Sequence, residues 1–149
     1  MTRRTLRISL TICLLASAAF AAWSWFQPYA WNPEPAARCK IKETLVTRDR
    51  EYYWVNVHLM LTPGMNHDLQ KPVYLLSAAG KKFEPADSTF ASIEGQPPTE
   101  IWFKFWLDAS DLTGPLELHL NDGKLRVKSS KEAPRLDKST PRNFTTTRW

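Results

Sequence analysis

The sequence lacks the short motifs that mark common catalytic and cofactor-binding sites. Its 149 residues contain no C-x-x-C pair, no H-E-x-x-H, no glycine-rich phosphate loop and no nucleophile elbow. Three carboxylates, Glu100, Asp108 and Asp111, flank one predicted strand, but their contexts are those of Asp in a turn. His119 falls on the outward face of another predicted strand. We therefore expect a protein that is not an enzyme and holds no cofactor.

Cysteine is scarce, with Cys13 inside an apolar segment and Cys39 alone beyond it. A pair placed in this way predicts no disulfide within a domain. Arg38 stands directly before Cys39, where a lipid-attachment site needs a small residue, so the sequence does not indicate a lipoprotein. Because 43% of the residues are hydrophobic, one hydrophobic core must hold the fold together.

A basic folded body is also absent, although the net charge is +5. Residues 1–7 carry +3 and residues 124–149 carry +6, which leaves −4 on the stretch between them. Nucleic-acid binding needs a basic face on the folded domain, so we expect no nucleic-acid partner. Two basic ends suit contact with an anionic membrane or an acidic partner.

One long apolar run is present, because residues 8–26 carry no charge and follow the basic residues 1–7. As a helix this run is about 28 Å long, close to the hydrocarbon thickness of a bilayer. A retained transmembrane anchor and a cleaved signal both fit, since residues 16–18 and 19–21 each form a small-residue cleavage site. On either interpretation the domain lies outside the cytoplasm, anchored at the periplasmic face of a bacterial inner membrane or free in the periplasm.

The residues that flank this run suit a membrane interface. By the positive-inside rule the basic side chains keep the N-terminus in the cytoplasm, and Trp and Tyr are enriched at the interfaces. The predicted interface residues are Arg3, Arg4, Arg7, Trp23, Trp25, Tyr29 and Trp31.

Beyond the run, residues 27–38 contain three prolines and predict an extended stalk. Residues 39–128 alternate with period two in six or seven short stretches punctuated by glycine and proline, with a tight turn expected at Asp122–Gly123. This pattern predicts an all-β fold, a single immunoglobulin-like antiparallel β-sandwich. Residues 129–149 lack a core pattern and predict a basic tail, either mobile or laid along a partner.

The order of the strands carries a family resemblance. The stretches YYWVNVHLML, VYLLSAAGKKFEP, EIWFKFWL and LELHL follow one another in a way that resembles small immunoglobulin-like, telokin-like extracytoplasmic domains of bacterial envelope proteins. The resemblance covers roughly residues 40–128, implies that fold and a location outside the cytoplasm, and brings no catalytic residues. The chain differs from that group in its lack of a lipid-attachment cysteine and in its basic tail.

Several aromatic residues are candidates for contact with a partner. Alternation places Trp54, Trp102 and Trp106 on the face of the sheet away from the core, where they form either a binding surface or a second small core. In the tail, Phe144, Arg148 and Trp149 combine aromatic side chains with arginine, a pairing typical of interface hot spots.

A metal site is the alternative for the stretch HLMLTPGMNH. His58, Met60, Met65 and His67 follow the spacing H-x-M-x4-M-x-H, and thioether with imidazole ligands suits Cu(I). The opposing interpretation is that Met60 packs at the sheet edge, His58 is an ordinary strand residue, and the other two belong to a solvated loop.

Together these features predict a non-catalytic, membrane-anchored accessory or scaffold subunit that docks on a larger membrane or envelope protein complex. The alternative is a soluble periplasmic binder, either of Cu(I) through the His and Met residues or of a glycan through the tryptophans.

Overall fold

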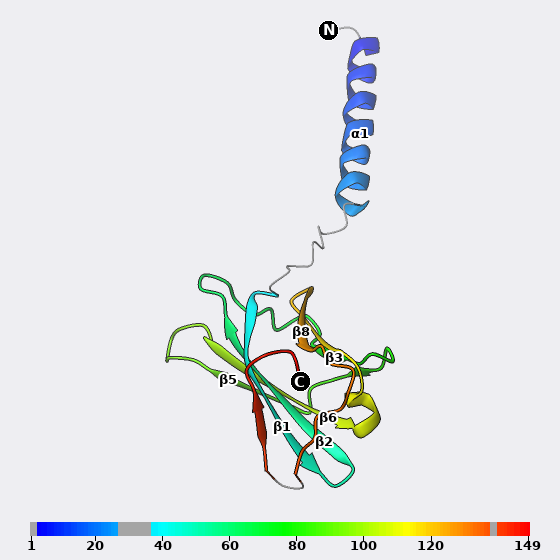
Figure 1. Cartoon of the computed structure of the whole chain (residues 1–149). Helices are drawn as coiled ribbons and strands as arrows, with labels where there is room; N and C mark the ends of the chain where they lie inside the picture. The colour runs from blue at the N-terminus through cyan, green and yellow to red at the C-terminus, as the bar shows by residue number, and fades with distance from the viewer. Residues whose placement is uncertain (1–2, 27–36, 138–139) are drawn as a thin grey trace. The chain divides into compact units, whose positions relative to one another are not determined.

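The computed structural model describes residues 3–26, 37–137 and 140–149. Within these ranges the chain forms one helix and a compact β domain, two units that are described separately (Figure 1).

Helix α1 (Arg3–Phe26) contains the apolar run. Its stretch Arg4–Trp23 has a mean hydropathy of 1.7, so the helix is long and apolar enough to cross a membrane or to act as a signal sequence. The helix starts before the predicted run because Arg and Leu, which dominate residues 3–7, are favourable helix residues.

Part of the predicted membrane interface lies within the described residues. The side chains of Arg4, Arg7 and Trp23 are exposed on α1. The side chains of Arg3 and Trp25, together with Tyr29 and Trp31, lie outside the described part, as does most of the predicted stalk.

The β domain contains nine strands among the described residues, more than the six or seven that alternation predicts. A single 3₁₀ helix, η1 (Ala109–Leu112), follows the sixth strand. The strands are β1 (Cys39–Asp49), β2 (Tyr52–Leu61), β3 (Tyr74–Leu76), β4 (Lys82–Phe83), β5 (Asp87–Ala91), β6 (Glu100–Asp108), β7 (Leu116–Leu120), β8 (Gly123–Lys128) and β9 (Arg142–Phe144).

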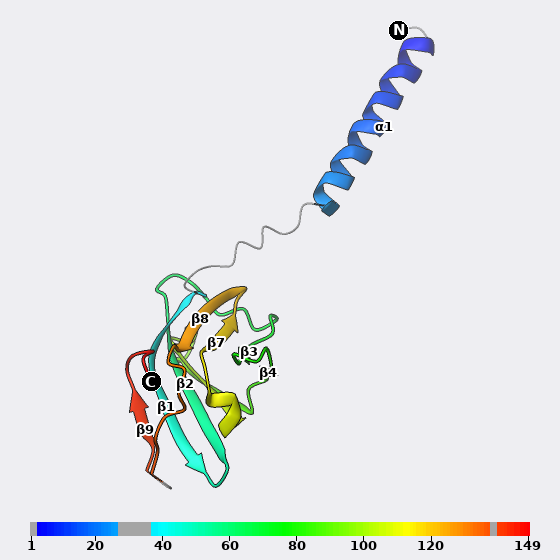
Figure 2. The same ribbon diagram turned by 45° about the vertical axis from the view of Figure 1, so that its right-hand side comes forward.

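The strands form two antiparallel sheets, visible in Figures 1 and 2. The five-stranded sheet has the order β5-β6-β2-β1-β9, and the four-stranded sheet has the order β4-β3-β7-β8. The longest pairings join β2 to β1 and to β6, with Thr47 opposite Trp54 and Trp54 opposite Trp106. The prediction of a mostly β protein behind one apolar helix is therefore confirmed.

Alternation along the strands places the core. Val55, Leu59 and Phe105 of the five-stranded sheet are fully buried, as are Leu75 and Leu118 of the other sheet, and all belong to one hydrophobic cluster. Burying each such side chain contributes about 1.5–3 kcal/mol relative to leaving it in water. One shared core therefore holds the two sheets together.

The predicted tail belongs to this core, which corrects the interpretation that residues 129–149 lack core residues. Strand β9 pairs with β1, and the Trp149 ring is only 7% exposed. Its Nε1 donates to the Val127 carbonyl at 3.0 Å, and the ring stacks on Phe144 with centroids 4.6 Å apart. The domain thus continues past residue 128.

The β7–β8 turn is displaced by one residue from the predicted Asp122–Gly123. Leu120 pairs with Gly123, and the two central residues, Asn121 and Asp122, have φ of 50° and 66°. Asn and Asp tolerate this left-handed conformation better than other non-glycine residues. The buried Asn121 side chain also donates to the Ala37 carbonyl at 2.8 Å, which fixes the start of the domain to this turn.

Candidate binding surface on the five-stranded sheet

Three aromatic side chains gather on the face of the five-stranded sheet that points away from the core. Strand alternation places Tyr52 and Trp54 of β2 on this face, and cross-strand pairing brings Trp106 of β6 opposite Trp54. The Trp106 ring lies 4.3 Å from that of Tyr52 and 6.1 Å from that of Trp54, measured between centroids. We call these three residues the aromatic cluster.

The aromatic cluster is open to solvent. Trp106 is 48% exposed and Tyr52 is 38% exposed. Charged groups border it, since the Lys104 ammonium lies 4.5 Å from the centroid of the Trp54 ring and Asp108 pairs with Tyr52 across the strands. Such a surface offers stacking area together with hydrogen-bonding groups.

Trp102 lies on the same face but is separate from the cluster. Its ring stacks on His58 of β2, with centroids 4.3 Å apart and an interplanar angle of 20°. The three tryptophans predicted as one surface therefore divide between two neighbourhoods. Tyr52, which was not among the predicted residues, takes the third place in the cluster. The same alternation that placed Trp54 on the outer face of the sheet also places Tyr52 there.

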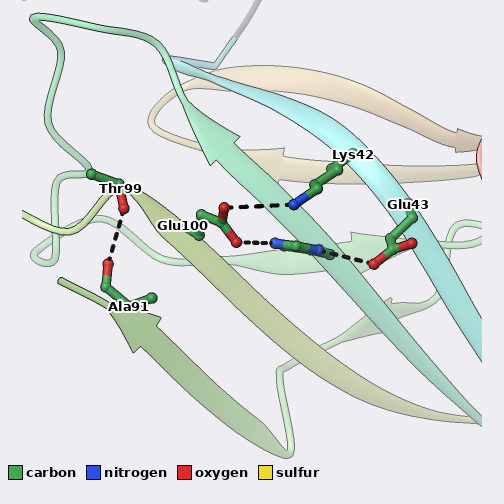
Figure 3. A network of polar contacts seen from close by, with 6 residues as sticks. Lys42, Glu43, Ala91, Thr99 and Glu100 are labelled. Atoms are coloured by element: carbon green, nitrogen blue, oxygen red, sulfur yellow. Dashed lines mark hydrogen bonds and ion pairs between the residues drawn. The ribbon is translucent and has the colours of Figure 1, made fainter.

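His58 is buried, and it lies between the carboxylates of Glu43 and Glu100. Figure 3 shows these two carboxylates together with Lys42. The Nδ1 of His58 lies 3.2 Å from Glu43 Oε1, and its Nε2 lies 2.6 Å from Glu100 Oε2. The Lys42 ammonium adds an ion pair to Glu100 at 3.6 Å. Ionised carboxylates only accept hydrogen bonds, and a histidine ring nitrogen that carries a proton can donate one. The network joins β1, β2 and β6 across the sheet.

The same contacts hold both carboxyl groups in the ionised form. Hydrogen bonds from Asn143 and then from His58 lower the pKa of Glu43 below its ordinary value. The hydrogen bond from His58, helped by the charge of Lys42, lowers the pKa of Glu100. The two ionised carboxylates and the histidine therefore connect neighbouring strands. Because both ring nitrogens are engaged in these contacts, neither is available to an incoming ligand.

The structure does not assemble the predicted copper site. His67 packs against Phe103, a core residue, with ring centroids 5.9 Å apart, whereas His58 lies on the opposite face of that sheet. Met60 and Met65 are each 46% exposed. Among the described residues no group of three or more His, Cys, Asp or Glu is placed to hold a metal ion. Strand alternation brought His58 and Met60 to one face, but the loop carries His67 to the other.

The three predicted tail residues have different surroundings. Trp149, which was predicted to contact a partner, fills the domain's own core. Phe144 is partly buried beneath the Arg142 guanidinium, whose central carbon lies 5.1 Å from the ring centroid. Arg148 is exposed on the surface of the domain.

Two other titratable residues considered in the sequence analysis contact side chains of other segments of the domain. Asp111 is buried, and its Oδ2 accepts a hydrogen bond from Lys81 Nζ at 2.9 Å. The ring of His119 stacks on Tyr74 at 4.6 Å. Both arrangements connect one segment of the domain to another.

Comparison of the chain with protein-family models, curated proteins and solved structures finds no match.

Proposed function

We propose that this protein is a non-catalytic, membrane-anchored accessory subunit that docks on a larger membrane or envelope protein complex through the aromatic cluster. The observation that carries the proposal is the open cluster itself, with Tyr52 and Trp106 side by side in solvent. Trp and Tyr are enriched among the residues that dominate binding energy at protein interfaces, and exposed apolar patches mark interaction sites.

The apolar helix supports the membrane part of the proposal. A retained α1 confines the domain to the membrane plane and raises its effective concentration near a membrane partner, so a modest contact area suffices. The exposed Arg4 and Arg7 at its N-terminal end favour an N-terminus in the cytoplasm and a domain on the periplasmic face. Cleavage of α1 would instead release a periplasmic binder.

We further infer that the domain is an immunoglobulin-like β-sandwich of the telokin-like kind. Two antiparallel sheets that contribute to one buried cluster support this assignment. In such folds the strands serve as a rigid frame, and an exposed sheet face is a common place for recognition.

Site-specific photocrosslinking tests the proposed docking surface. A benzophenone amino acid at position 106 is expected to link the full chain to one membrane protein in native membranes, and Trp106→Ala is expected to reduce co-purification of that protein at least tenfold. Ile93, an apolar residue that is 64% exposed and lies outside the cluster, provides the control through Ile93→Ala. Equal recovery with both variants would exclude the aromatic cluster as the docking surface.

A glycan is the second candidate ligand for the cluster. Tyr52 and Asp108 also border a hollow of about 540 Å³, which Arg48, Glu51 and Ser110 line with polar groups. Aromatic rings beside paired donors and acceptors suit a sugar ring. Quenching of tryptophan fluorescence by cell-wall oligosaccharides, lost in Trp106→Ala, would favour the glycan over a protein partner.

A further inference from the structure

A second surface, separate from the aromatic cluster, lies at the opposite edge of the five-stranded sheet from β9. A hollow of about 370 Å³ opens there on the core side of β5. Its floor is Phe103, a core residue of β6, and Phe90 meets Phe103 edge to face with centroids 6.5 Å apart. The apolar part of its wall is made by Leu69, Pro72, Val73, Pro85 and Phe90.

Strand β5 borders this hollow with an unpaired edge. One edge of β5 pairs with β6 along Asp87–Ala91, and no described strand pairs with the other edge. Backbone donors and acceptors of alternate residues therefore face outward. The side chains of residues 87–90 are exposed, and residues 88–91 include neither Lys nor Pro, the residues that commonly block such edges.

Ser88 and Phe90 connect the edge with the hollow. Both line the hollow, and they are alternate residues of β5 that point to the core side, since Ser88 pairs with Phe103. A strand added beside β5 would point every second side chain toward the same side. The volume is sufficient for a large apolar side chain.

One carboxylate lies at the hollow. Glu84 lines the hollow and its side chain is exposed, whereas Asp87 pairs with Lys104 on the outer face of the sheet. Lys71 also lines the hollow, but its ammonium is ion-paired to Asp122. Glu84 forms no ion pair with a residue that the structure describes. The charge of Glu84 is therefore complementary to a cationic group of a ligand.

We propose that β5 binds an extended, basic-apolar peptide segment of a partner protein by strand addition. Its backbone pairs with the free edge of β5, one apolar side chain enters the hollow, and a neighbouring Lys or Arg side chain lies near Glu84. Backbone pairing supplies affinity, and the hollow supplies specificity for the side chain. This surface shares no residue with the aromatic cluster, so failure of one proposal does not affect the other.

Peptide selection on the full chain tests the proposal. A random decapeptide phage library is selected on the protein in lipid nanodiscs, with empty nanodiscs for counter-selection, and the selected peptides are then measured by fluorescence polarisation. We expect an apolar residue flanked by Lys or Arg. Ser88→Trp fills the hollow and is expected to weaken binding at least tenfold, and Glu84→Lys is expected to weaken it severalfold.

Lys124→Trp is the matched control, because it places the same ring on an exposed position of β8, an edge strand of the other sheet. It is expected to leave peptide binding unchanged, as is Trp106→Ala. Circular dichroism melting checks that each variant is folded.

Failure to select any peptide, or equal binding to Ser88→Trp and Lys124→Trp, would overturn the proposal. A dimer of the full chain that Ser88→Trp abolishes, without peptide binding, would assign the edge to a second copy instead.

Discussion

At the scale of single residues, His58 lies between two carboxylates and a tryptophan ring. It contacts a carboxylate at each ring nitrogen, and Trp102 covers one face of the ring. Asn143 of β9 also donates to Glu43, so the hydrogen-bond network extends from β6 to β9 at the edge of the sheet. One imidazole thereby connects four strands of the five-stranded sheet.

The lowered pKa values of Glu43 and Glu100 predict acid sensitivity. Both pKa values lie below the ordinary 4.5 in the folded protein. The ionised carboxylates therefore stabilise the fold fully above about pH 4.5, and this stabilisation is lost as the pH falls through the folded-state values. Glu100→Gln removes one of these carboxylates, so the urea midpoint of this variant is expected to fall less steeply between pH 5 and pH 3.

Glu84→Gln is the control for this acid dependence, since Glu84 is exposed and lies outside the His58 network. Tryptophan fluorescence follows unfolding in each case. If Glu100→Gln and Glu84→Gln show the same pH dependence as the wild-type chain, the His58 network does not contribute to acid sensitivity.

Single positions were predictable where they depend on alternation alone. Trp54 and Trp106 were placed on the outer face because neighbouring residues of a strand point to opposite sides. The partners of His58 were not predictable, because Glu100 lies 42 residues away and reaches His58 only through the register of two strands. The burial of Trp149 likewise depends on pairing between distant segments.

At the scale of elements, the connections between strands determine how closely the segments approach. Gly114 lies between η1 and β7 with φ of 86°, and a Cβ added there would lie 2.6 Å from the Cβ of Ala78, in the β3–β4 turn. Its carbonyl also accepts a hydrogen bond from the buried Lys128 at 2.9 Å. The two turns therefore pack in direct contact at a residue without a side chain.

This contact predicts different effects for two glycine variants. Gly80 has nearly the same φ, 81°, but a Cβ added there would meet no atom within 4 Å. Gly80→Ala is expected to cost only the left-handed strain, about 1–2 kcal/mol. Gly114→Ala adds overpacking and is expected to cost about 1–3 kcal/mol more. Urea unfolding of the full chain in detergent measures the difference, and equal losses would show that the two turns separate without cost.

Elements with an alternating hydrophobic pattern were predictable, and β5 and β9 were not. Alternation located β1, β2, β6, β7 and β8, and the stretch VYLLSAAGKKFEP in the predicted strand order contains β3 and β4. Strand β5 has the polar sequence DSTFA and β9 has three residues, so neither shows a periodic hydrophobic pattern. Both elements form because β6 and β1 offer an edge to pair with, which is a property of the assembled sheet.

At the scale of the whole molecule, an apolar helix precedes a domain whose two proposed recognition surfaces are on one sheet. The aromatic cluster occupies the outer face of that sheet, and the peptide-binding edge proposed above lies along β5. Because the two use different residues, one domain offers two separate contacts. That arrangement suits a subunit that connects other proteins.

Retention of the helix is the prediction that belongs to this scale. If α1 is a membrane anchor, the protein isolated from its native membrane is expected to have the full mass of 17.2 kDa. Intact-protein mass spectrometry measures this directly. A loss of about 18–21 residues, at either small-residue site, would identify α1 as a cleaved signal and the domain as a free periplasmic protein.

The pairing of β1 with β9 also has a consequence for the time course of folding. Glu43 and Asn143 meet across 100 residues of chain, and Trp149 enters a core begun by Cys39. During synthesis in the order of the sequence, the outer edge of β1 stays open until residues 142–144 arrive. Contacts of such long range form slowly. Throughout that interval the unfinished domain exposes apolar surface, and proteases and chaperones compete for it.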